Sequence, residues 1–355
     1  MRVVHVVGTR PNLVKMAPVI AALCQRFPEW PATIVHTGQH YDRLMSEIFL
    51  EELGVPEPDH LLGVGSGSHA EQIARVLERL EPVLESERPD LVIVPGDVNS
   101  TLGAALCAAK LDIPVAHVES GLRSFDRTMP EEGNRIVADH LSALCFLHCE
   151  EAIENLRAEG VADERMKFVG NTMIDTLVAL AGRVRERRAA EGLGLEPGNY
   201  LLVTLHRPAL VDGPLLGEAM ARLEQVGNEL PVVFPAHPRT RKMLDGASHS
   251  GVTLIDPIGY LEFLSLESQA AAVLTDSGGI QEETTYLGVP CFTLRDNTER
   301  PVTVRAGTNT LLGLAPDRIA EIPGLLAARP AERPQPPEKW DGKAAERVAD
   351  ALAGR

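Results

Sequence analysis

Four side chains of this 355-residue chain have the chemistry of general acids and bases and stand beside short apolar runs or at the start of a helical stretch. They are Asp97, Glu119, Glu131 and His206. Carboxylates and imidazoles are the groups that most often transfer protons in enzymes. Simpler explanations exist, because Asp97 can cap a helix, Glu131 can interact with a helix dipole, and a lone histidine is more often structural. Glu119, which follows an apolar run, has no such local explanation.

Two glycine-containing segments mark places where an anion could bind, and the first lies near the N-terminus. Gly8 is followed by Arg10, Pro11 and Lys15. A glycine turn with proline at the first helical position is typical of a helix that opens at the carboxyl end of a parallel strand. Such helix starts bind nucleotides and other anions. The segment matches neither GxGxxG nor a P-loop, so an ordinary turn with solvated Arg10 and Lys15 also explains it.

The second of these segments covers residues 275–283. Ser277, Gly278 and Gly279 precede a helical stretch and would expose several backbone N–H groups together. That arrangement suits a diphosphate. Two glycines weaken a helix start, and the sequence shows no structural advantage that would offset this. We therefore favour a ligand site over simple capping by Ser277. Glu283 would lie one turn into the helix, near enough to accept two ribose hydroxyl groups.

Further basic and imidazole groups are expected at the same ends of the strands. They are Arg123, Arg135, His237 and Arg300. His237 repeats, one strand later, the arrangement around His206. Arg300 belongs to a loop of alternating charge that could equally be solvent-facing surface. Carboxylates gathered at one rim with these groups would repel one another, which in general raises carboxyl pKa values and suits acid–base work.

Short apolar runs alternate with helical stretches along the whole chain. The predicted strands are 2–7, 32–37, 91–95, 114–118, 143–148 and 166–169, then 200–205, 231–235, 252–255, 271–275, 289–293 and 308–312. Helical patterns include 11–26, 69–86, 99–111 and 131–142. Apolar strands that alternate with helices predict parallel sheets covered on both faces. Two such series predict an α/β protein with two doubly wound domains.

The predicted domain boundary lies near residue 170. The first domain would comprise 1–169 together with 341–355, and the second would comprise 170–340. The proline-rich run 329–337 cannot be helical and predicts a surface connector. Beyond it, helical periodicity returns from Asp341 to Leu352, with Asp341 as the expected cap.

The composition is that of an ordinary globular protein, with 44% hydrophobic and 24% charged residues. A net charge of -16 repels phosphate backbones and argues against a nucleic-acid partner. The longest apolar runs are strand-sized, which is too short to cross a membrane. The N-terminal residues lack the apolar stretch and cleavage site of a signal peptide. We therefore expect a cytoplasmic protein without a membrane partner.

Taken together, the motifs resemble those of the non-hydrolysing UDP-N-acetylglucosamine 2-epimerase family. The matching segments, in the family's order, are GTRPNLVKMAPV, TGQHYDRLM, GDVNSTL, PVAHVESGLRS, MPEEGNR, VGNTMIDTL, TLHRP, DSGGIQEET, LRDNTERPVTVRAGT and WDGKAAERV. They cover nearly the whole chain, and the ordered set is more specific than any single piece. The resemblance implies a GT-B fold, with two Rossmann-like domains, an active site in the cleft between them, and a C-terminal helix that returns to the first domain.

The resemblance also implies the reaction. Members interconvert UDP-N-acetylglucosamine and UDP-N-acetylmannosamine, and related enzymes act on modified UDP-N-acetylhexosamines, without NAD or a metal. UDP leaves by elimination across C1 and C2, which gives 2-acetamidoglucal and UDP. UDP then adds back, and C2 receives its proton on the other face. A homodimer is typical of the family.

The family's functional residues carry over to matching positions. The catalytic positions are those of Asp97, Glu119, Glu131 and His206. The substrate-binding positions are those of Arg10, Lys15, Arg123, Arg135, His237, Phe263, Ser277, Gly278, Gly279, Glu283 and Arg300. Among these, Phe263 matches the residue that packs near the uracil.

Three other functions share this fold and remain alternatives. They are a hydrolysing epimerase that releases N-acetylmannosamine and UDP, a GT-B glycosyltransferase, and a non-catalytic UDP-sugar-binding protein. The acidic segments VESGLR and MPEEGNR favour an epimerase over a transferase. A sensor would tolerate the loss of Asp97, Glu119 and Glu131, yet all three are present.

Overall fold

The computed structural model describes residues 1–38, 49–236, 238–244, 249–330 and 332–354. The chain forms two compact units. Unit 1 comprises Met1–Ala179 and Glu338–Arg355, and unit 2 comprises Leu180–Pro337. The sequence placed these limits at 169/170 and 340/341. In the structure the first limit falls inside the helix α7 (Thr172–Arg187), because the first half of this helix packs within unit 1.

Unit 1 contains a seven-stranded parallel sheet in the order β3-β2-β1-β4-β5-β6-β7. Its strands are β1 (Val3–Val7), β2 (Ala32–His36), β3 (His60–Leu61), β4 (Leu91–Pro95), β5 (Val115–Val118), β6 (Leu144–Leu147) and β7 (Met166–Phe168). The order reverses at β1 and β4, which pair directly. Open sheets of this kind bind ligands at the carboxyl ends of the strands beside such a reversal.

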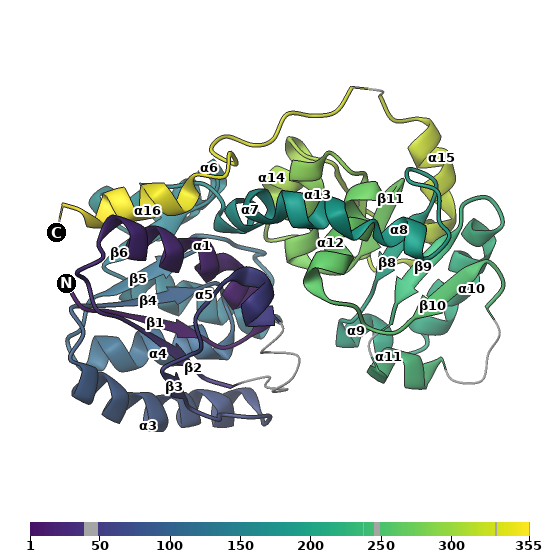
Figure 1. Ribbon diagram of the computed structural model, residues 1–355. Helices are drawn as coiled ribbons and strands as arrows, with labels where there is room; N and C mark the ends of the chain where they lie inside the picture. The colour runs from purple at the N-terminus through teal and green to yellow at the C-terminus, as the bar shows by residue number, and fades with distance from the viewer. Residues whose placement is uncertain (39–48, 237, 245–248, 331, 355) are drawn as a thin grey trace. The chain divides into compact units, whose positions relative to one another are not determined.

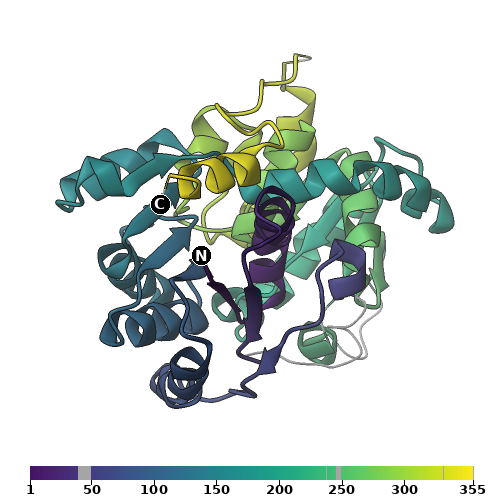
Figure 2. The same cartoon turned by 60° about the vertical axis from the view of Figure 1, so that its left-hand side comes forward.

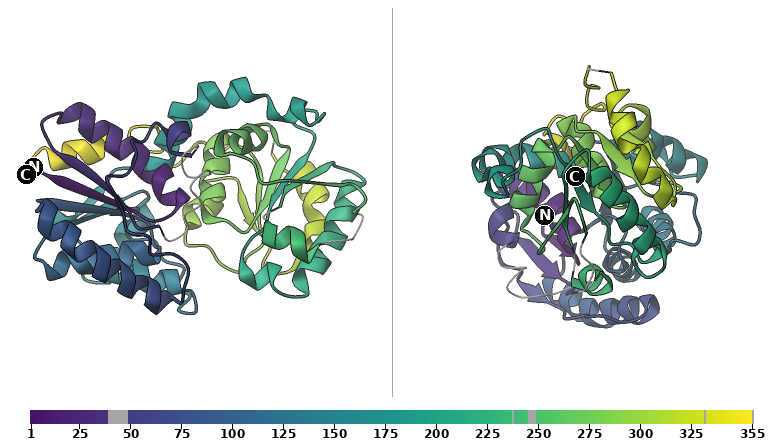
Figure 3. Two further views of the ribbon diagram at one scale, coloured as in Figure 1. Left: turned by 60° about the horizontal axis from the view of Figure 1, so that its bottom comes forward. Right: turned by 90° about the vertical axis from the view of Figure 1, so that its right-hand side faces the viewer.

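Helices cover both faces of this sheet (Figures 1 and 3). They are α1 (Arg10–Arg26), α3 (His69–Glu87), α4 (Asn99–Lys110), α5 (Pro130–Leu141), α6 (Glu150–Ala158), α7, the 3-10 turn η1 (Asp163–Arg165) and α16 (Ala344–Leu352). One face packs Val4, Val92 and Val94 against α3, α4 and α5. On the other, α16 lies along α1 (Figures 1 and 2).

The last helix, α16, begins later than predicted and has a different cap. Asp341 was expected at its start, but the helix begins at Ala344. The Asp175 carboxylate, from α7, accepts the backbone N–H groups of Ala344 and Ala345 at 3.1 and 2.7 Å. Asp341 instead pairs with Arg347 and accepts the backbone N–H of Lys343, the residue just before the helix. A residue of the first half of the chain therefore anchors the returning helix.

Unit 2 contains a six-stranded parallel sheet in the order β10-β9-β8-β11-β12-β13. Its strands are β8 (Leu201–Thr204), β9 (Val232–Pro235), β10 (Val252–Ile255), β11 (Ala272–Thr275), β12 (Cys291–Thr293) and β13 (Asn309–Leu311). Alternate residues face opposite layers, as strand geometry requires. Leu201 and Val203 pack in the layer of α10, whereas Tyr200 and Leu202 pack in the layer of α8 and α12.

The helical segments of unit 2 complete both layers (Figure 3). They are α8 (Ala189–Gly192), α9 (Pro208–Val211), α10 (Leu215–Gly227), α11 (Pro238–Met243), α12 (Tyr260–Gln269), α13 (Gly278–Leu287), α14 (Pro301–Arg305), the 3-10 segment η2 (Pro316–Glu321) and α15 (Ile322–Ala327). The predicted pair of parallel α/β sheets is confirmed. The strand β3 was missed. No helix in the described ranges is both long and apolar enough to cross a membrane.

Candidate active site

The predicted carboxylates of unit 1 lie at the carboxyl ends of neighbouring strands. Asp97 follows β4 and Glu119 follows β5, and these two strands pair directly. Glu131, half-buried, stands in the first turn of α5. Gly96 and Glu119 both have left-handed backbones, with φ of 64° and 69°. Such a φ is strained for a glutamate, and strain of this kind tends to gather at functional sites.

Lys15 and Glu119 form a buried ion pair. The Lys15 Nζ lies 2.6 Å from Glu119 Oε2, and each side chain is only 6% exposed. Lys15 comes from α1, so this helix brings a cation to the end of β5. A Cβ atom at Gly96 would lie 3.0 Å from Lys15 Nζ, so this position needs glycine for space as well as for its backbone.

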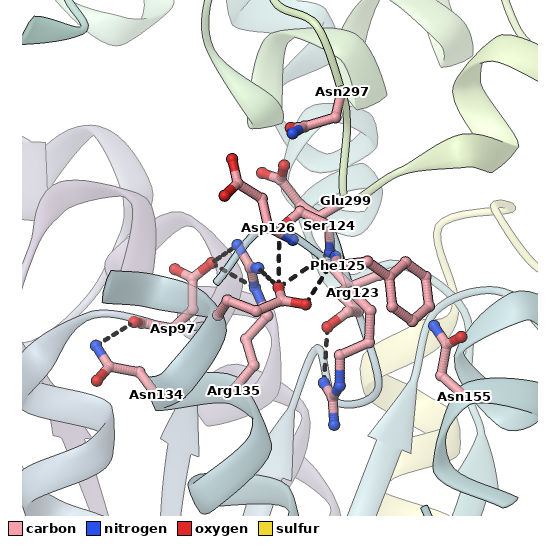
Figure 4. Close-up of polar contacts among 12 residues, drawn as sticks. Asp97, Arg123, Ser124, Phe125, Asp126, Asn134, Arg135, Asn155, Asn297 and Glu299 are labelled. Atoms are coloured by element: carbon pink, nitrogen blue, oxygen red, sulfur yellow. Dashed lines mark hydrogen bonds and ion pairs between the residues drawn. The ribbon is translucent and has the colours of Figure 1, made fainter. Parts of the chain in front are cut away.

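Asp97 is joined to helix α5 through Arg135 (Figure 4). Arg135 Nε and Nη2 donate to Asp97 Oδ2 at 2.9 and 2.7 Å. Its Nη1 donates to Glu132 at 2.6 Å. Glu132 in turn accepts hydrogen bonds from the backbone of Ser124 and Phe125. The guanidinium therefore connects Asp97 to the loop that precedes α5.

The carboxylates at this rim are therefore neutralised locally. The sequence predicted mutual repulsion among them, but Asp97 faces Arg135 and Glu119 faces Lys15. The sequence did not single out Glu132, whose side chain is buried. A glutamate three residues before an arginine on a predicted helix is the signal that could have paired it with Arg135.

Two predicted substrate contacts of unit 1 have different surroundings. Arg10 is exposed at the start of α1. Arg123 is buried, and its guanidinium contacts Asp139 at 2.8 Å and Glu159 at 2.7 Å. In this structure, Arg123 therefore holds other parts of unit 1 together.

In unit 2, His206 stands at the end of β8 beside a buried aspartate. His206 Nδ1 lies 3.0 Å from Asp276 Oδ1, and the imidazole is 54% exposed. The backbone N–H groups of His206 and Arg207 donate to Asp276 Oδ2. Burial alone would raise the pKa of Asp276, but these hydrogen bonds and the imidazole hold it below its usual value. Asp276 thus orients the ring.

The glycines that open α13 make room for Arg300. Ser277 is the N-cap residue and Gly278 is the first residue of the helix. A Cβ atom at Gly278 would clash with the Arg300 guanidinium. Arg300 is buried and contacts Glu282 at 2.9 Å and Glu299 at 2.5 Å. Gly279 follows in the first turn, so the helix start presents backbone N–H groups as predicted.

Glu283 is buried one turn into α13. It accepts a hydrogen bond of 2.6 Å from the hydroxyl of Tyr260. Burial, with a smaller contribution from the nearby Glu282, raises the pKa of Glu283 to about 7, although the hydrogen bond from Tyr260 lowers it. Phe263, on α12, packs against the apolar cluster that contains Tyr200 and Leu202. His237 lies outside the described residues.

The two units thus carry different chemistry. Unit 1 presents carboxylates with buried cations at adjacent strand ends, an arrangement suited to proton transfer. Unit 2 presents an oriented imidazole and a helix start rich in N–H donors, an arrangement suited to a phosphate group.

Comparisons with known proteins identify one family. A family model described as UDP-N-acetylglucosamine 2-epimerase matches residues 23–353. The chain is 41% identical over 366 residues to the UDP-N-acetylglucosamine 2-epimerase of Methanocaldococcus jannaschii, covering 99% of each chain. It is 42% identical over 327 residues to the UDP-2,3-diacetamido-2,3-dideoxy-D-glucuronate 2-epimerase of Pseudomonas aeruginosa, covering 90% and 91%.

The fold also matches that of a solved member of this family. The crystal structure of the Methanocaldococcus jannaschii UDP-GlcNAc 2-epimerase in complex with UDP-GlcNAc and UDP superimposes with a TM-score of 0.92 at 40% identity, covering 100% of both chains. The two parallel-sheet domains are therefore of the GT-B type, and the protein is an epimerase. These matches agree with the two parallel sheets and the carboxylates at their strand ends. The chain therefore belongs to the UDP-N-acetylglucosamine 2-epimerase family.

Proposed function

We propose that this protein is a non-hydrolysing epimerase that inverts C2 of a UDP-linked N-acetylhexosamine and keeps UDP on the sugar at the end of each turnover. UDP-N-acetylglucosamine and UDP-N-acetylmannosamine are its expected substrate pair. The observation that carries the proposal is the pair of carboxylates at neighbouring strand ends, Asp97 beside Arg135 and Glu119 beside Lys15. A protein that only bound the nucleotide would have no use for two oriented acid–base groups there.

The reaction follows from these groups. A carboxylate of unit 1 removes the C2 proton, the C–H electron pair forms the C1=C2 bond, and the C1–O bond breaks. UDP departs with the electron pair of the broken C1–O bond, which leaves 2-acetamidoglucal. In the return step a UDP oxygen bonds to C1 while an acid delivers a proton to the opposite face of C2. The sum is an isomerisation, so no oxidant or reductant is consumed.

The residues divide between the two ends of the substrate. We assign proton transfer and sugar contacts to Asp97, Glu119 and Glu131. His206, oriented by Asp276, stabilises the charge that grows on the leaving diphosphate. The remaining nucleotide contacts are assigned to Arg10, Lys15, His237, Phe263, Ser277, Gly278, Gly279, Glu283 and Arg300. Arg123 and Arg135 then act by positioning, since both are occupied by carboxylates.

The bound sugar could carry further groups. The relative from Pseudomonas aeruginosa is named for a diacetamido glucuronate substrate, and it is as similar in sequence as the relative named for UDP-N-acetylglucosamine. Both substrates share the 2-acetamido group and the C2 proton that the proposed chemistry uses. The two nucleotide sugars should therefore be assayed side by side.

Product analysis separates the candidate functions. The protein is incubated with UDP-N-acetylglucosamine, and phosphorus and proton NMR spectra are recorded over time. A non-hydrolysing epimerase gives UDP-N-acetylmannosamine with the diphosphate still attached. Stoichiometric free UDP with N-acetylmannosamine would instead identify a hydrolysing enzyme. Unchanged substrate, in a sample that binds it, would support a sensor and contradict the proposal.

A further inference from the structure

His117 lies in β5, two residues before Glu119, and its ring is fully buried. Its Nδ1 lies 2.7 Å from Asp139 Oδ1 on α5. Its Nε2 lies 2.6 Å from the carbonyl oxygen of Gly96, which immediately precedes Asp97. The ring therefore joins the turn that leads to Asp97 to helix α5, which carries Asp139.

These two contacts determine the protonation of the ring. A carbonyl oxygen can only accept a hydrogen bond, so Nε2 must carry a proton. Arg123 and the backbone N–H of Gly121 both contact Asp139 Oδ2, and the adjacent guanidinium favours the ionised carboxylate. The other oxygen, Oδ1, is then an acceptor for the ring, and Nδ1 must donate as well. A histidine that donates from both nitrogens is an imidazolium.

The surrounding charges support the ionised pair. Burial alone would raise the pKa of Asp139, but His117 and Arg123 hold it below its ordinary value. The other titratable side chain close to Asp139 is the Cys145 thiol of β6, whose pKa burial raises to about 12, so it stays neutral. Arg165 donates to the Asp139 carbonyl and adds positive charge. A protonated Asp139 beside Arg123 would be the less favourable form.

The same pair ties together two strained turns. Asp139 Oδ2 accepts the N–H of Gly121 at 3.1 Å, in the turn that begins at Glu119. His117 holds Gly96 in the turn that leads to Asp97. Gly96 and Gly121 have φ of 64° and 79°. One hydrogen-bonded pair thus controls the relative placement of the two strand ends.

We infer that His117 is a positioning residue that donates from both ring nitrogens and, with Asp139, holds the Asp97 and Glu119 turns in register for proton transfer at C2. The catalytic consequence of this inference rests on the proposed function. The hydrogen bonds donated by both nitrogens of the buried ring do not depend on that function. Misplacing a reacting group by about 1 Å can cost about 10²-fold in rate, which sets the expected size of the effect.

The protonation state is tested on the resting full-length protein. Nitrogen-15 NMR spectra of histidine-labelled protein are recorded at neutral pH. The signal that is missing from the His117→Gln variant is that of His117. Two N–H groups on this ring are expected. A single N–H at neutral pH would overturn the inference.

The positioning role is tested by kinetics. His117→Gln should lower kcat about 10²-fold and leave KM and the Kd for UDP within about twofold, because the nucleotide contacts lie elsewhere. The matched control is His60→Gln, since His60 also contacts a glutamate, at 3.0 Å, but is 34% exposed at the edge strand β3. An unchanged kcat in a folded His117→Gln variant would contradict the role, as would an equal loss of UDP binding.

A second variant covers the case in which His117→Gln does not fold. Asp139→Asn keeps an acceptor for Nδ1 but removes the negative charge beside the ring, so the loss of one N–H signal of His117 at neutral pH is expected. A ring that remained doubly protonated in Asp139→Asn would show that Asp139 is not responsible. If the protein proved not to be an epimerase, the NMR results would still show whether both nitrogens of His117 carry a proton.

Discussion

The ammonium group of Lys15 lies 2.6 Å from the carboxylate of Glu119, and both side chains are buried. Helix α1 thus contributes a counter-charge to the end of a strand more than one hundred residues away in sequence. In the proposed reaction, this ammonium group balances the charge of the carboxylate that contacts the sugar.

Removing Lys15 should harm both stability and catalysis. Lys15→Met leaves the Glu119 carboxylate buried without its cation, which should cost about 3–5 kcal/mol in the free energy of unfolding. The double variant Lys15→Met/Glu119→Gln should recover part of this stability but no activity. Urea unfolding and steady-state kinetics provide both readouts, with the exposed Lys110→Met as control. Additive effects on stability would mean that the two side chains do not interact.

Asp276 should control the contribution of His206. In Asp276→Asn the imidazole loses the carboxylate 3.0 Å away that orients it, and two backbone N–H groups lose a charged acceptor. We expect kcat to fall by about 10- to 100-fold, because the imidazole is no longer held toward the leaving group. Steady-state rates of the wild type and the variant at saturating substrate measure this. An unchanged kcat in a folded Asp276→Asn variant would contradict the orienting role.

Glu283 should make UDP binding depend on pH. Its pKa is raised to about 7, and the proposed ribose contact requires a carboxylate that accepts hydroxyl protons. Below this pKa the protonated acid must first ionise, so affinity should rise about tenfold from about pH 6 to about pH 8. Calorimetric titrations with UDP are compared between the wild type and Glu283→Gln, which cancels the ionisation of UDP itself. The same pH dependence in both proteins would refute the assignment.

Asp175 should stabilise the docking of α16. Asp175→Ala leaves two N–H groups at the helix start without an acceptor, which should cost about 1–2 kcal/mol in unfolding free energy. Asp175→Asn retains one acceptor and should cost less. The control is Asp341→Ala, which removes a more exposed ion pair and should cost under about 1 kcal/mol. If Asp341→Ala were the more damaging change, the sequence-based choice of cap would have been better than the structural one.

The sequence was most informative about the sheets and least about contacts between distant residues. Apolar runs such as 91–95 and 272–275 predicted buried parallel strands because both faces of such strands are covered. The strand β3 was missed because its two residues, His60 and Leu61, give no periodic pattern.

Long-range pairing escaped prediction for a physical reason. The cap of α16 by Asp175 joins residues about 170 positions apart, and nothing local to either one indicates the other. The same holds for Lys15 with Glu119. The roles of Glu132 and Asp139 were missed because a carboxylate on a helix is usually solvated, and only the fold shows that these two are buried.

The most direct test of the account is the fate of the C2 hydrogen. The protein is incubated with UDP-N-acetylglucosamine in heavy water, and deuterium at C2 is followed by proton NMR in the wild type, Asp97→Asn, Glu119→Gln and His206→Ala. The account predicts deuterium at C2 of both UDP-sugars in the wild type, with exchange slowed about 10²-fold or more in each variant. Epimerisation without deuterium at C2, or undiminished exchange in all three variants, would contradict it.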